Sequence, residues 1–170
     1  DETLGFMVDL SSPASKSLNW MNGIQYYLNQ DIELTKGHII FIESPWAVTA
    51  ISQVQFWPNF NLANYGNGDA KGILSVDVSD WFTPGLNGKI AKECTLKEII
   101  DEVWDQMEKS LNINGQKIID RSMIITTHVD SDIKEEVQKV DNDFLSEHNA
   151  EPLLVNTANS WSKRPEAITN

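Results

Sequence analysis

The sequence predicts an α+β fold: a mixed, largely antiparallel sheet covered by helices, in one domain spanning residues 1–170. Three observations support this class. Several short segments alternate apolar and polar residues with the period of two that is typical of strands. One segment, at about 96–111, has a strong helical period. The order of the segments shows no regular strand–helix–strand rhythm, which favours a mixed or antiparallel sheet.

The first two strands are predicted between Gly23 and Ile42. In Gly23–Leu28, the residues Ile24, Tyr26 and Leu28 share one face, as the pleat of a strand requires. His38–Ile42 is nearly all apolar and rich in β-branched residues, which predicts an inner strand.

A short helix is predicted next. Ser44 can cap it, Pro45 suits its first turn, and apolar residues recur at helical spacing as far as about Phe56. A strand over the same residues is the competing interpretation. The following Asn59–Gly72 is rich in Asn, Gly and Asp, which predicts a loop. Ile73–Val78 alternates again and predicts a strand with one wetter face.

The strongest local pattern predicts a helix at Leu96–Leu111. Thr95 and Glu98 form a capping box, in which each side chain accepts a hydrogen bond from the backbone amide of the other residue. The apolar face of the helix consists of Ile99, Ile100, Val103, Trp104, Met107 and Leu111. Lys97, Asp101, Asp105 and Glu108 lie on the opposite face, so one side of the helix is expected to pack on the sheet.

The C-terminal part is less regular. Met123–Val129 predicts a strand, Asp130–Asn149 is charged and expected to be exposed, and Leu153–Thr157 predicts a last strand. Asn156–Asn170 then continues without a closing helix or strand. We therefore expect the chain to be a piece of a larger protein.

Composition excludes several classes of function. The chain has a formal net charge of −12, and its 13 Lys and Arg residues are scattered, so nucleic acid is not an expected partner. Cys94 is the only cysteine, which rules out an internal disulfide and suits the cytoplasm. No apolar run approaches the roughly 18 residues of a transmembrane helix. The expected location is cytoplasmic, with peripheral membrane association of the parent protein as the alternative.

No reaction centre is predicted from the residues themselves. His38, His128 and His148 are far apart and lack further ligands at metal-binding spacing, so no metal is expected. Cys94 precedes a helix, where a thiol pKa can fall, but no histidine is near it in sequence. The Gly-x-Ser-x-Gly and Gly-x-Gly-x-x-Gly patterns are both absent. No catalytic residue is therefore assigned.

A set of short segments carries a family resemblance. They are Trp20–Leu28, Gly37-His38, Ser44–Ala47, Gln53–Trp57, Gly72–Trp81, Lys92–Thr95 and Glu151–Thr157. In combination they resemble bacterial FAD-dependent oxidoreductases of the flavin-containing amine oxidase and phytoene desaturase superfamily. The resemblance covers most of the chain, and Asp130–Asn149 matches least. It implies the substrate-binding domain of a larger flavoenzyme, which roofs the flavin, while the FAD-binding segments lie outside this chain.

This resemblance also implies where a substrate would bind. Tyr26, Trp46, Phe56 and Trp57 are expected to line a site for an apolar or amine small molecule, with core packing as their alternative role. Trp161 is expected near the flavin, with covering of a strand end as its alternative. FAD is expected in the intact parent and not on this chain alone, and the rest of the flavoenzyme is the expected partner. Two alternatives stay open: a stand-alone binding module for an apolar small molecule, and an acidic module that meets a basic partner.

Overall fold

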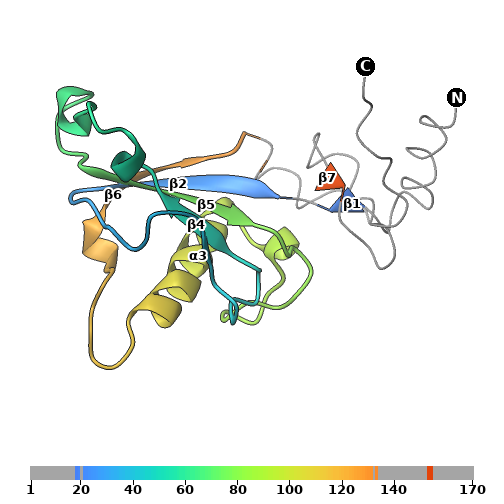
Figure 1. The fold of residues 1–170 in the computed structure, drawn as a ribbon. Coiled ribbons are helices and arrows are strands. Elements are labelled where there is room, and N and C mark those ends of the chain that lie inside the picture. Colours follow the sequence, from blue (N-terminus) through green and yellow to red (C-terminus); the bar gives the residue numbers. More distant parts are fainter. Residues whose placement is uncertain (1–17, 20, 132, 134–152, 155–170) are drawn as a thin grey trace, which may run out of the picture.

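The computed structural model describes residues 18–19, 21–131, 133 and 153–154. Its strands are β1 (Leu18–Asn19), β2 (Asn22–Leu28), β3 (Ile39–Ile40), β4 (Thr49–Ser52), β5 (Gly72–Val78), β6 (Ile124–Val129) and β7 (Leu153–Leu154). Its helices are α3 (Leu96–Leu111) and the 3-10 turns η1 (Val54–Phe56), η2 (Leu62–Asn64), η3 (Ala91–Glu93) and η4 (Arg121–Met123). Strands β3-β4-β5-β2-β6, in that order, form one five-stranded antiparallel sheet with α3 against one face (Figure 1), and β1 pairs with β7. The predicted α+β class is confirmed.

The centre of the sheet is β2, which pairs with β5 on one side and β6 on the other. Ile24, Tyr26 and Leu28 alternate along it and are all fully buried, as the period of two predicts. Partners across the strands share a face, so Leu74 and Val76 of β5 extend the same apolar surface. This surface is the floor of the core.

Helix α3 supplies the other half of the core. The predicted capping box at Thr95 and Glu98 is present, and it satisfies amide groups in the first turn. Trp104 lies fully buried against Tyr26, with ring centroids 5.1 Å apart. The Tyr26 hydroxyl donates a 2.8 Å hydrogen bond to the carbonyl of Ile100, which ties the central strand to the helix.

The predicted helix from Pro45 to about Phe56 is wrong. Thr49–Ser52 forms strand β4, which was the competing interpretation, and only η1 remains helical. Ala47 has a φ of 48°, outside the range of an α-helix, and it turns the chain into the sheet. Ala50 pairs with Val76 of β5, and both side chains are buried. These apolar residues are therefore buried by pairing between two strands and not along one face of a helix.

Strands β2 and β5 each begin one residue earlier than predicted, whereas the other predicted strands form within narrower limits, and the predicted inner position of His38–Ile42 is wrong. This segment shortens to the edge strand β3, which among the described residues pairs with β4 alone. Ile40 of β3 is therefore 70% exposed, and Ile42 beyond it is 92% exposed. Met123 belongs to η4, and β6 begins at Ile124. Of the predicted last strand, Leu153–Leu154 forms β7, and its other residues lie outside the described part of the chain.

Candidate functional site

An aromatic hollow follows the turn η1. It is an open depression of about 450 Å³, lined by Trp57, Pro58, Asn59 and Phe60. Two short turns fold this segment: the Trp57 amide donates to the Val54 carbonyl at 3.0 Å, and the Phe60 amide donates to the Trp57 carbonyl at 2.9 Å. Because the backbone is held at both ends, the two rings are presented in a defined arrangement.

Three aromatic rings stand together at this site. Trp57 meets Phe60 edge to face, with centroids 5.2 Å apart, and Phe60 stacks on Tyr65 at 4.7 Å. Trp57 is 38% and Phe60 36% exposed, so both rings combine firm contacts on one side with an open surface on the other. Neighbouring aromatic rings that share an exposed apolar surface are a feature of binding sites.

Polar groups around the rings are mostly occupied by the fold. The Asn61 side chain accepts a 3.1 Å hydrogen bond from the Ala63 amide and caps η2. Asn67 donates to Asp69 at 2.6 Å within the next turn. Asn59 differs, since it is one of the residues that line the hollow and its side chain makes no hydrogen bond to any residue that the structure describes. It is therefore the polar group best placed to orient a bound molecule.

The structure separates the residues that the sequence grouped as a substrate site. Trp57 lines the hollow, and Phe56 is exposed beside it without lining it. Tyr26 and Trp46 are both 0% exposed and belong to the core, which was their alternative role. Trp161 lies outside the described residues.

Tyr26 and Trp46 also have their polar groups satisfied internally. Burial raises the pKa of Tyr26 well above its ordinary value, and its hydroxyl donates to a helix carbonyl. The Trp46 indole donates to the Thr83 carbonyl at 3.1 Å. Neither side chain presents a free group to a ligand.

A buried polar network beneath the sheet escaped the sequence reasoning. The Glu102 carboxyl group accepts hydrogen bonds from the backbone amides of Leu86 and Asn87, the latter at 3.0 Å, and from Gln106 at 2.8 Å. Gln106 in turn accepts from Ser44 and from the Trp46 amide. The network fastens two loops to α3. A side chain at Gly85 would collide with the Glu102 carboxyl group, so the close approach of this loop to α3 requires glycine here.

Cys94 does not have the character of a nucleophile. The thiol is buried, and burial raises its pKa, whereas a helix N-terminus by itself would lower it. The Asn87 side chain lies 3.7 Å from the sulfur.

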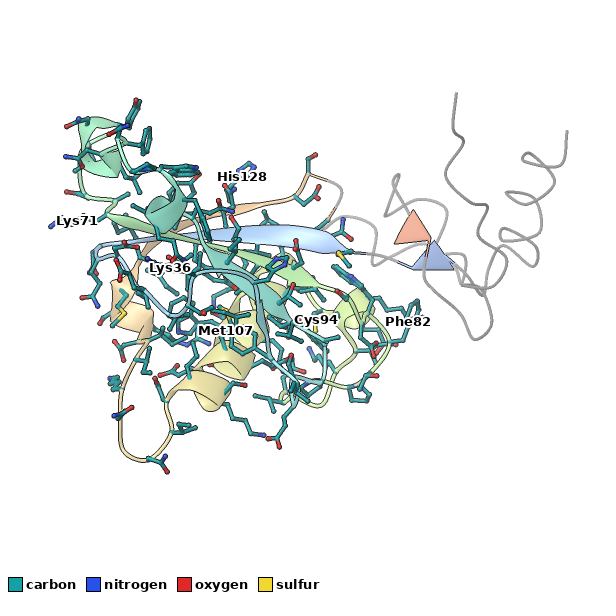
Figure 2. All side chains as sticks on the ribbon, viewed as in Figure 1. Lys36, Lys71, Phe82, Cys94, Met107 and His128 are labelled. Atoms are coloured by element: carbon teal, nitrogen blue, oxygen red, sulfur yellow. The ribbon has the colours of Figure 1, made fainter. Side chains whose placement is uncertain are left out.

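The face of the sheet opposite α3 carries polar and titratable groups. The side chain of His128 on β6 projects outward from this face, whereas Met107 of α3 lies on the opposite side of the sheet (Figure 2). Burial raises the pKa of Asp77 on β5, and the nearby carboxylate of Asp130 adds to this effect. Among the described residues, no three His, Cys, Asp or Glu side chains form a group that could hold a metal ion.

The fold and the hollow define an antiparallel α+β domain with an exposed aromatic surface. No protein-family model, no curated protein and no solved structure matches the chain. Within the part of the chain that the structure describes, no helix combines the length and the apolar character needed to cross a membrane. The resemblance to flavin-dependent oxidoreductases stays a prediction.

Proposed function

We propose that this chain is a binding domain that takes an apolar small molecule in the hollow at Trp57. The observation that carries the proposal is the pair of half-open rings, Trp57 and Phe60, held on a turn-rich backbone around a depression of about 450 Å³. That volume falls within the range of about 300 to 1,000 Å³ typical of small-molecule sites. The free amide of Asn59 supplies one orienting hydrogen bond.

We further propose that the domain serves as the substrate-binding part of an FAD-dependent oxidoreductase. In this proposal the substrate is an apolar molecule or an amine, and the flavin, held by the rest of the parent flavoenzyme, accepts the hydride. The specific support is the sheet face opposite α3, which no α-helix covers among the described residues and which the remainder of a parent could adjoin. A cytoplasmic location, where Cys94 stays reduced, accompanies this proposal.

Replacing Trp57 by alanine is expected to weaken binding of an apolar ligand. A suitable probe is N-phenyl-1-naphthylamine, which is uncharged, so the net charge of −12 does not affect its affinity. Its fluorescence titration should show binding to the native chain and about tenfold weaker binding to Trp57→Ala, equivalent to about 1.4 kcal/mol.

The matched control is Phe82→Ala. Phe82 is also an exposed aromatic residue, but it follows β5, packs under Lys92 and is not one of the residues that line the hollow. The Phe82→Ala chain should bind the probe with the same affinity as the native chain. Equal affinities for Trp57→Ala and the native chain would refute the site.

The flavoenzyme proposal predicts that the chain alone binds no FAD. Purified chain should be colourless, and titration with FAD should leave both the flavin absorbance spectrum and the flavin fluorescence unchanged. Free riboflavin serves as the control for nonspecific stacking on exposed rings. A yellow protein with stoichiometric flavin would contradict the assignment to the substrate domain.

A further inference from the structure

Strand β6 stands at one edge of the five-stranded sheet. It is last in the strand order β3-β4-β5-β2-β6, and among the residues that the structure describes it pairs with β2 alone. The strand at the opposite edge, β3, has only two residues. With six residues, β6 is the longer of the two edges.

The hydrogen bonds show which groups of β6 point outward. The Asp130 amide donates to the Gly23 carbonyl at 3.0 Å. In an antiparallel ladder the residues that bond to a given neighbour alternate, so His128 and Thr126 bond toward β2 as well. The backbone groups of Thr127 and Val129 therefore face away from the sheet, and no described residue bonds to them there.

The side chains of β6 leave this edge unprotected. The strand reads Ile-Ile-Thr-Thr-His-Val, with no Lys, Asp, Glu or Pro, and all but His128 are β-branched. Natural sheets usually blunt an edge with charge, proline or a bulge. Here the register irregularity lies at one end, between Tyr27 and Leu28 on β2, and leaves Thr126–Val129 in regular pairing.

We propose that β6 is a strand-addition site at which a second copy of this chain pairs antiparallel. A twofold axis through Thr127 places this residue opposite Thr127 of the second copy. The outward amide and carbonyl groups of the two residues can then bond to each other. In this register His128 lies opposite Thr126 of the second copy, and the regularly paired segment ends at Val129, next to the irregularity at Ile125. Cross-strand pairs of β-branched residues stabilise a sheet, and no like charges face each other in this register.

The net negative charge of the chain determines how salt should affect the pairing of two copies. Each copy carries a net charge of −12, so two copies repel at low ionic strength. Salt at 0.5 M shortens the screening length well below 10 Å. Association is therefore expected to strengthen with added NaCl, unlike binding of a basic partner, which salt would weaken.

Thr127→Pro tests the proposal by removing the outward amide. Proline is tolerated where its missing N–H faces away from the sheet, so the pairing of β6 with β2 should persist. Sedimentation velocity of the full chain in 0.5 M NaCl, between about 10 and 500 µM, should show a concentration-dependent dimer for the native chain and for Thr127→Ala. Thr127→Pro should associate at least tenfold more weakly, with an unchanged circular dichroism spectrum.

A second variant keeps the test decisive if Thr127→Pro does not fold. Ile125 is 39% exposed, and Ile125→Lys places a charge on the edge without altering the backbone. It should also remain monomeric. A native chain that stays monomeric at 500 µM, or an Ile125→Lys chain that dimerises like the native one, would overturn the proposal.

Discussion

Replacing Glu102 by alanine is expected to lower the free energy of unfolding by about 2–4 kcal/mol. The Glu102 side chain is almost fully buried and accepts hydrogen bonds from the amides of Leu86 and Asn87 and from Gln106. Its removal leaves the buried Gln106 side chain without its acceptor, and an unsatisfied buried donor costs about 1–3 kcal/mol. The part-buried amides of Leu86 and Asn87 also lose their partner, at a smaller cost because water can reach that loop. The cavity left by the side chain adds to this loss.

Urea denaturation followed by circular dichroism measures the effect. Glu102→Gln should cost less than Glu102→Ala, because it keeps the shape and one acceptor oxygen. The matched control on the same helix is Glu108→Ala, which loses one hydrogen bond from Asn112 and should cost about 1 kcal/mol or less. Equal losses for Glu102→Ala and Glu108→Ala would show that the network does not hold the loops to α3.

Replacing Trp104 by alanine should have a comparably large effect, about 3–5 kcal/mol. Trp104 is fully buried, and its ring meets Tyr26 between α3 and β2, so truncation opens a large cavity at the centre of the core. The surrounding strands are held by their own hydrogen bonds and cannot collapse far into that space.

Trp104→Phe provides a sharper test of the same site. The indole nitrogen of Trp104 is buried and has no hydrogen-bond partner among the described residues. Phenylalanine removes this unsatisfied donor while keeping most of the apolar ring, so we expect a loss below about 2 kcal/mol. Measured by the same urea titration, a Trp104→Phe chain as unstable as Trp104→Ala would indicate that the indole N–H is satisfied in solution.

Local sequence patterns predicted the strands and the helix in which apolar residues recur at a regular spacing within one continuous segment. The alternation in Gly23–Leu28 and Ile73–Val78 and the helical face of Leu96–Leu111 each specify an apolar surface by themselves. The capping box at Thr95 was equally readable, because both of its hydrogen bonds join residues three positions apart.

Patterns of this kind did not predict elements that depend on distant partners. Apolar residues at Ala47, Ala50 and Ile51 fit a helix and a strand equally well over so short a segment. Pairing with β5 decided the outcome, and it also set β3 at an edge. A sequence does not state which of its strands will lie last in a sheet.

The candidate site shows the same division. An aromatic residue at Trp57 suggested a ligand surface, yet the same argument applied to Tyr26 and Trp46, which lie in the core. The exposed fraction of the side chain distinguishes a ligand-binding ring from a core ring. That fraction depends on which other segments pack on the ring. Glu102 gave no signal, because its partners are backbone amides about 15 residues upstream.

The sequence by itself therefore determined the α+β class, the three longest sheet strands, helix α3 and the acidic character of the chain, since these follow from local period and composition. The tertiary structure alone decided which aromatic rings remain exposed, which carboxyl group is buried and which of the described strands stands last in the sheet. Each of these depends on contacts between segments far apart in the chain. The hollow at Trp57 and the edge at β6 are consequences of that packing.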